Sequence, residues 1–192
     1  MTYLIVAIAA YLLGSIPFGV VMAKLFGLGD LRQIGSGNIG ATNVLRTGNK
    51  PAAFLTVVFD AGKGAAAVMI ARNFGGEDVA GIAGLFALLG HLYPIYLRFQ
   101  GGKGVATFMG TLLALSFPVG LAACATWLVT ALVFRFSSLS AVVAAVASPI
   151  FAYLLYHKHG ATLVLFMSAL VIYRHGGNIK RLLNGTEPKI GK

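Results

Sequence analysis

Acidic residues are scarce in this chain. Only five of its 192 residues are Asp or Glu, and all charged residues together make up 10%, far below the quarter or so expected of a soluble domain. Hydrophobic residues make up 58%, so the chain has too little polar surface to cover a water-soluble fold. The composition therefore excludes an ordinary soluble domain and favours a protein embedded in a bilayer.

Cysteine and the common catalytic motifs are also missing. The single cysteine, Cys124, lies inside an apolar run, which excludes an internal disulfide and a cysteine metal cluster. The sequence has no HExxH pattern, no GxSxG elbow and no cysteine nucleophile. No Asp or Glu stands five residues after any histidine. General-base catalysis by a carboxylate-oriented histidine at that spacing is therefore unsupported.

Apolar runs of about 20 residues recur along the sequence and predict membrane-spanning helices, because a helix satisfies its own backbone hydrogen bonds in lipid. The fold class is therefore all-α, and the length allows one domain, residues 1–192. An alternative is that residues 105–135 form one long broken helix, which gives six spans. We expect seven helices, near residues 3–25, 52–71, 79–97, 105–117, 119–135, 139–157 and 161–174.

The basic residues favour seven spans with the N-terminus outside and the C-terminus in the cytoplasm. In that topology the outward segments hold only Arg72 and Lys158, as the positive-inside rule requires. A six-span topology would separate the basic 27–51 loop from the basic C-terminal tail. The net charge of +10 does not indicate nucleic-acid binding, since the basic residues lie in short segments between apolar spans. The inward basic residues are Lys24, Arg32, Arg46, Lys50, Arg98, Lys103, Arg135, Arg174, Lys180, Arg181, Lys189 and Lys192.

The first inward loop is rich in glycine and hydrogen-bond donors. Gly35, Gly37 and Gly40 match a dinucleotide-binding pattern, but no strand precedes them, so that interpretation fails. Glycines still allow successive backbone N–H groups to converge on an anion. The sequence therefore favours an anion site over a solvated turn. Side chains that can add donors are Ser36, Asn38, Thr42, Asn43 and Arg46.

Two further inward segments suit phosphate. Lys103 stands between glycines at the start of an apolar helix, where the helix dipole and free N–H groups favour an anion. The alternative is a flexible loop with one positive-inside lysine. Near the C-terminus, His175 and Asn178 follow Arg174 in a basic segment. Binding of anionic lipid headgroups would explain the basic residues there, but it explains His175 and Asn178 less well.

Asp60 and Lys63 fall within an apolar span, three residues apart on one helix face. Charges in a membrane are costly and are usually paired or functional, and this spacing lets the two side chains pair with each other. We interpret them as a structural ion pair, with direct catalysis as the alternative. His91, in the third expected helix before Pro94, is interpreted as a packed, hydrogen-bonded residue.

These loops resemble those of the PlsY family, the bacterial acyl-phosphate:glycerol-3-phosphate acyltransferases. The matching motifs lie at residues 14–19, 36–43, 101–107, 174–182 and 185–187, in the family's order. The resemblance implies transfer of a fatty acyl group from acyl phosphate to the 1-hydroxyl of sn-glycerol 3-phosphate, giving lysophosphatidic acid and phosphate, the first step of phospholipid synthesis. It also implies seven helices, an inner-membrane location with a cytoplasm-facing site, and no metal or other cofactor.

The resemblance also suggests a role for each motif residue. Residues expected to bind the acyl phosphate are Gly37, Asn38, Gly40, Ala41, Thr42 and Asn43. Residues expected to bind glycerol 3-phosphate and to act in catalysis are Ser36, Arg46, Lys103, His175 and Asn178. Supporting residues are Asp60, Lys63, His91, Gly101, Gly102 and Thr107. The expected partners are the two substrates, membrane lipid and an upstream enzyme that produces acyl phosphate, with no nucleic acid.

Two other functions remain open at this point. One is a transporter of organic phosphate, a function that seven helices, glycine-rich breaks and the charges Asp60 and Lys63 would suit. However, carriers bind substrate near the midplane of the membrane, whereas here the donors cluster at one face. A membrane scaffold for anionic lipid would explain the basic tail and not the glycine loops. Phosphate release from acyl phosphate separates an acyltransferase from both.

Overall fold

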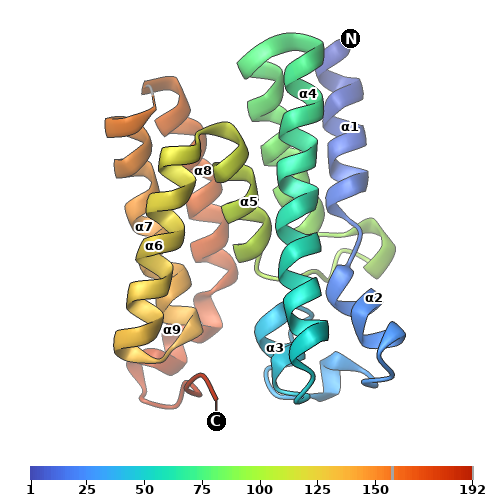
Figure 1. Ribbon diagram of the computed structural model, residues 1–192, viewed down its shortest axis with the longest axis vertical. Coiled ribbons are helices and arrows are strands. Elements are labelled where there is room, and N and C mark those ends of the chain that lie inside the picture. Colours follow the sequence, from blue (N-terminus) through green and yellow to red (C-terminus); the bar gives the residue numbers. More distant parts are fainter. Residues whose placement is uncertain (157, 192) are drawn as a thin grey trace. The chain divides into compact units, whose positions relative to one another are not determined.

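The computed structural model describes residues 1–156 and 158–191, and those residues form helices and loops without a β-strand, as expected of an all-α protein (Figure 1). The chain divides into two compact units, residues 1–115 and 116–192, and each is described by itself. The helical stretches long and apolar enough to cross a membrane are Thr2–Leu25, Lys50–Leu97, Phe117–Phe134 and Ser137–Leu155. Shorter apolar helices are Val105–Leu115 and Gly160–Arg174.

The N-terminal unit begins with a helix that is interrupted near its middle. The region expected as one helix over 3–25 forms α1 (Thr2–Gly14) and α2 (Phe18–Leu25). Pro17 occupies the cap position of α2, and because it has no N–H and a fixed φ it cannot continue the ladder of α1. The break leaves the carbonyl of Ile16 outside both helices, where a side chain can reach it.

Helix α4 (Lys50–Leu92) is two antiparallel arms joined at Gly75 and Gly76. Gly76 has a φ of 70°, a conformation that glycine adopts without strain, and the chain turns back there (Figure 1). A Cβ on Gly84 would lie 3.1 Å from the Cγ2 of Val68, so the arms touch closely. The arms correspond to the expected helices 52–71 and 79–97, although the second ends at Leu92.

Small residues let the helices of this unit approach one another. A Cβ on Gly14 would overlap the backbone of Ala87, and a Cβ on Gly90 would overlap the carbonyl of Tyr11. Close backbone contact through small residues is the usual way that helices associate in lipid, where burial of apolar surface gives little driving force. The unit is completed by η1 (Leu31–Gln33), α3 (Ala41–Leu45), η2 (Ile95–Leu97) and α5 (Val105–Leu115).

The C-terminal unit contains α6 (Phe117–Phe134), α7 (Ser137–Leu155), α8 (Lys158–Arg174) and α9 (Gly176–Leu183). Extended backbone at Ser116 separates α6 from the preceding helix. The first three helices match the expected 119–135, 139–157 and 161–174 within a few residues, and residue 157 lies outside the described ranges. Helix α9 was not expected, because its eight residues are too few and too polar to register as an apolar span.

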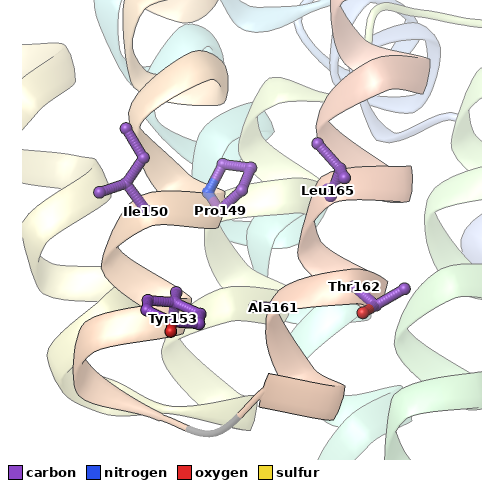
Figure 2. A pocket seen from close by; sticks show the side chains of 6 residues that line it. All are labelled: Pro149, Ile150, Tyr153, Ala161, Thr162 and Leu165. Carbon is purple, nitrogen blue, oxygen red and sulfur yellow. The ribbon is translucent and has the colours of Figure 1, made fainter.

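An open, mostly apolar groove of about 490 Å³ runs between α7 and α8 (Figure 2). Its lining carries no charged side chain, so it lacks a positive charge to balance a phosphate. The lining residues are Pro149, Ile150, Tyr153, Ala161, Thr162 and Leu165.

Candidate functional site

The first loop, residues 35–46, is shaped by one buried asparagine. The Oδ1 of Asn43 accepts hydrogen bonds from the backbone N of Ser36 at 3.0 Å and from the Oγ of Ser36 at 3.3 Å. Its Nδ2 donates to the carbonyl of Leu31 at 2.8 Å. Gly35 and Gly37 have φ angles of 52° and 67°, which favour glycine. Asn43 therefore holds the curl that the glycines permit and presents Ser36 at an exposed position.

Arg46 follows α3 and lies along the same curl. A Cβ on Gly35 would sit 2.7 Å from the Cδ of Arg46 and 2.7 Å from the Oδ1 of Asn43, so a larger residue there would push both side chains. The structure thus brings Ser36, Asn43 and Arg46 together around Gly35. A guanidinium beside a hydroxyl on a glycine-rich turn is suited to binding a phosphate group.

The second loop, residues 98–104, contains the predicted Lys103. Arg98, Phe99 and Gly104 have positive φ angles of 50°, 62° and 82°, so the backbone winds tightly before α5 begins at Val105. Lys103 is half-buried, whereas Gly102 and Gly104 on either side are buried. The backbone N–H of Gly102 donates to the carbonyl of His91 at 3.2 Å. The loop is therefore anchored at its glycines, on either side of the lysine.

Arg32, on η1 just before the first loop, contacts the second loop, and sequence reasoning missed this contact. Its Nη2 donates to the carbonyl of Gln100 at 2.8 Å, and its Nη1 donates to the Oε1 of Gln100 at 3.2 Å. A Cβ on Gly37 would lie 3.1 Å from the carbonyl oxygen of Arg32. In the sequence Arg32 counted only as one more inward positive charge. No local pattern could reveal its partner, because Gln100 lies in another loop.

The supporting residues that were predicted within the helices contact one another or pack between helices. The Nζ of Lys63 lies 2.8 Å from the Oδ1 of Asp60, which confirms the expected ion pair, and the Nδ1 of His91 lies 3.5 Å from the same oxygen. Thr107 is buried on α5. A Cβ added to Gly64 on α4 would lie 2.7 Å from the carbonyl oxygen of Thr107, so the two helices are in close contact there. These residues pack the helices that carry the two loops.

The C-terminal unit holds the other predicted catalytic residues. His175 is buried, and its Nδ1 lies 2.7 Å from the carbonyl oxygen of Val171. Because a carbonyl only accepts, Nδ1 is the donor of this contact, and in a neutral ring Nε2 is then the acceptor nitrogen. Asn178, on α9, donates to the Oε1 of Glu187 at 2.6 Å. Both side chains are therefore held in defined orientations.

Glu187 organises this end of the chain, although sequence reasoning assigned it no role beyond the motif. Its Oε1 also accepts from the Oγ of Ser138 at 2.6 Å, and its Oε2 accepts from the Nε of Arg181 at 2.7 Å. Burial would raise the pKa of Glu187, but these hydrogen bonds and the charge of Arg181 outweigh it and lower that pKa. The carboxylate ties the tail to α7 and to α9.

The lowered pKa of Glu187 predicts acid sensitivity of the tail. The carboxylate stabilises the folded chain fully above its ordinary pKa of 4.5, and this contribution is lost as the pH falls through the lower folded value. We expect Glu187→Gln to weaken amide hydrogen-exchange protection of residues 184–190 near neutral pH. On acidification, the protection of these residues should fall less in Glu187→Gln than in the wild type. Glu77→Gln, on an exposed turn, serves as control and keeps the wild-type decline. Equal acid sensitivity of Glu187→Gln and the wild type would contradict this account.

The predicted site residues thus fall into two groups. Ser36, Arg46 and Lys103 belong to the N-terminal unit, and His175 and Asn178 belong to the C-terminal unit. Among residues 1–156 and 158–191, no group of three or more His, Cys, Asp or Glu residues could hold a metal ion. The predicted site residues of the N-terminal unit supply a hydroxyl and two positive charges, and those of the C-terminal unit supply an imidazole and an amide.

Comparisons with known proteins cover both groups. A family model described as glycerol-3-phosphate acyltransferase matches residues 4–185. Curated relatives that carry the same description include one from Jannaschia sp. (strain CCS1), 63% identical over 186 residues, which are 97% of this chain and 92% of the relative. Another, from Dinoroseobacter shibae, is 63% identical over 187 residues, with coverage of 97% and 92%.

Solved structures agree with the sequence comparisons. The chain is similar to the glycerol 3-phosphate form of PlsY (YgiH), an integral membrane glycerol 3-phosphate acyltransferase, with a TM-score of 0.94 and 42% identity. It is also similar to the lysophosphatidic acid form of PlsY, with a TM-score of 0.92 and 41% identity. Both matches cover 100% of this chain and 96% of the solved chain.

Proposed function

The chain belongs to the glycerol-3-phosphate acyltransferase family, and from this membership we propose how its loops carry the reaction. It is an integral membrane enzyme of phospholipid synthesis, a glycerol-3-phosphate acyltransferase of the PlsY type that forms lysophosphatidic acid. We propose that acyl phosphate is the acyl donor and that the 1-hydroxyl of sn-glycerol 3-phosphate is the acceptor. The observation that carries this proposal is the presence of phosphate-suited loops between the apolar helices of the chain.

The reaction needs alignment more than activation. The acceptor hydroxyl oxygen forms a bond to the acyl carbon, the bond from that carbon to the phosphate oxygen breaks, and inorganic phosphate leaves. We propose that a phosphate oxygen of a substrate takes the hydroxyl proton. Since acyl phosphate already has a good leaving group, the protein contributes by positioning the reactants and stabilising developing negative charge.

The first loop is our candidate for the acyl-phosphate group. Its curl is held by Asn43, and the backbone N–H groups of Ser36, Gly37 and Asn43 already donate locally. The donors that we propose for the phosphate are the backbone N–H groups of Gly40 and Ala41 and the hydroxyl of Thr42, an exposed residue. Because Asn43 uses its amide within the loop, we propose that it shapes this site. The proposed acyl-phosphate residues are Gly37, Asn38, Gly40, Ala41, Thr42 and Asn43.

Glycerol 3-phosphate is assigned to the charged and polar side chains. Arg46 offers a forked guanidinium, which can contact two oxygens of one phosphate. Lys103, a half-buried residue, offers an ammonium as a compact positive charge. We propose that Ser36, His175 and Asn178 orient the glycerol portion. The order seen in His175 and Asn178, each held by an intramolecular hydrogen bond, supports a positioning role.

Purified protein in detergent with acyl phosphate and glycerol 3-phosphate tests the proposed activity directly. We expect inorganic phosphate and lysophosphatidic acid to appear in equal amounts, because each acyl transfer releases one phosphate. A transporter of organic phosphate, the alternative function, would release none above background. Replacing acyl phosphate by an acyl thioester tests the proposed donor, since product formation from the thioester alone would refute it.

Membrane orientation is a further part of the proposal. We propose seven spans, a cytoplasmic active site in a bacterial inner membrane, and one acyltransferase domain made of both units. Excess Lys and Arg in the loops that carry the site residues supports this orientation. An enzyme that makes acyl phosphate is the proposed upstream partner, because this donor must be supplied at the same membrane face.

Cysteine labelling checks the orientation. In a Cys124→Ala background, Asn38→Cys and Lys189→Cys should be shielded from an impermeant thiol reagent in intact cells and should react after permeabilisation. Asn73→Cys, exposed beside the turn between the arms of α4, should react in intact cells and serves as the outward control. Labelling of Asn38→Cys or Lys189→Cys from outside would overturn the proposed topology.

A further inference from the structure

Three ionisable side chains meet inside the N-terminal unit, and none of them is among the residues assigned to the substrates. The Oδ1 of Asp60 lies 2.8 Å from the Nζ of Lys63 and 3.5 Å from the Nδ1 of His91. Each of the three side chains is at most 5% exposed. Charges in an apolar span are costly, so they persist only where their partners hold them in a defined geometry.

One side of this cluster is fixed to the break between α1 and α2. The Nζ of Lys63 donates to the carbonyl of Ile16 at 2.7 Å, using the acceptor that the interruption at Pro17 exposes. The same ammonium lies 5.7 Å from the centre of the Phe18 ring, a favourable cation–π distance. Lys63 therefore links the cluster to the segment between α1 and α2, and a shift of its side chain would break both contacts.

The other side of the cluster supports the second loop. The carbonyl of His91 accepts from the N–H of Gly102, and a Cβ on Gly102 would overlap the Nε2 of the same histidine. A Cβ on Gly101 would overlap the carbonyl oxygen of His91 and would lie 2.5 Å from that of Leu92. The loop backbone thus rests directly on His91, immediately before Lys103.

We propose that Asp60, Lys63 and His91 form a positioning cluster that fixes the second loop relative to α4. The position of Lys103 in that loop is fixed in the same way. This inference rests on the proposed role of Lys103 in binding glycerol 3-phosphate. The cluster acts through the backbone of Gly102 and touches no substrate. Because displacement of a binding group by about 1 Å can cost 100-fold in rate, a support of this kind controls activity from a distance.

Gly102→Ala tests the contact, with Gly62→Ala as a matched control. A Cβ on Gly62 would meet nothing within 4 Å, so that variant adds the same methyl group to α4 without displacing a neighbour. We expect Gly102→Ala to raise the KM for glycerol 3-phosphate by about tenfold or more and to leave the KM for acyl phosphate within about threefold. Gly62→Ala should match the wild type. Loss of kcat with an unchanged KM for glycerol 3-phosphate would show a merely structural role and overturn the proposal.

A second variant isolates the role of the histidine ring. His91→Asn keeps a nitrogen at the position of Nδ1 facing Asp60 and removes the Nε2 edge that Gly102→Ala would strike. In the His91→Asn background, we expect Gly102→Ala to change the KM for glycerol 3-phosphate by less than about threefold, a strongly non-additive result. Equal effects of Gly102→Ala in both backgrounds would show that the methyl group acts elsewhere and would overturn the proposed contact.

Lys103→Ala, measured in parallel, separates this inference from the proposed function. If Lys103→Ala has wild-type kinetics, the proposed role of Lys103 and the positioning role both fail. If Lys103→Ala loses activity while Gly102→Ala behaves like Gly62→Ala, the proposed function stands and the positioning cluster is refuted. Loss of activity in Lys103→Ala together with the raised KM in Gly102→Ala supports both.

Discussion

Lys103→Ala is expected to lower kcat/KM for glycerol 3-phosphate by at least about 100-fold. Loss of a charged hydrogen bond costs roughly 1.5–3 kcal/mol, and here it also leaves a bound phosphate short of positive charge in a partly desolvated place. Lys103 is half-buried between buried glycines, so water replaces its ammonium poorly. Steady-state phosphate release at varied glycerol 3-phosphate measures the loss.

Two further variants test whether geometry or only charge matters. Arg46→Lys keeps the charge but loses the forked donor, so we expect a clear loss of kcat/KM. Lys189→Ala removes a charge from the exposed tail, where the ammonium lies 5.6 Å from the Phe136 ring, and should be nearly silent. Near-wild-type activity of Lys103→Ala and Arg46→Lys would mean that these residues serve only to orient the chain in the membrane.

Asp60→Ala is expected to destabilise the folded protein by about 3–5 kcal/mol. Removing one member of a buried ion pair leaves the other without its counter-charge, and here, among the described residues, Lys63 would keep only the carbonyl of Ile16 and the Phe18 ring as partners inside an apolar helix. The double variant Asp60→Leu with Lys63→Met removes both charges and should recover a large part of the loss. Reversible unfolding in detergent measures these differences.

An exposed ion pair provides the control for this prediction. Arg72 and Glu77 are 33% and 49% exposed in their side chains, although their atoms approach to 2.6 Å. Exposed pairs contribute about 1 kcal/mol or less, so Glu77→Ala should change stability by no more than that. If Asp60→Ala and Glu77→Ala proved equally mild, burial of the Asp60 and Lys63 pair would not have the energetic importance proposed for it.

Local features of the sequence were enough to predict most of the helical segments and the donor-rich loops. Apolar length and the spacing of basic residues depend on the bilayer as solvent and do not require knowledge of the tertiary contacts. The pairing of Asp60 with Lys63 was equally local, because residues three apart share a helix face. Helix α9 escaped prediction because an eight-residue amphipathic helix lacks the apolar run that marks a span.

Hydropathy, glycine content and charge were sufficient to predict an all-helical membrane protein with phosphate-suited loops, because they act through the local backbone and the solvent. Which distant groups meet depends on the tertiary structure. His91 reaches Asp60 because the chain reverses at Gly75 and Gly76, and Lys63 reaches Ile16 because Pro17 interrupts the first helix. Such contacts join residues far apart along the chain, and their geometry depends on how whole helices pack through small residues. No spacing rule in the sequence encodes that packing.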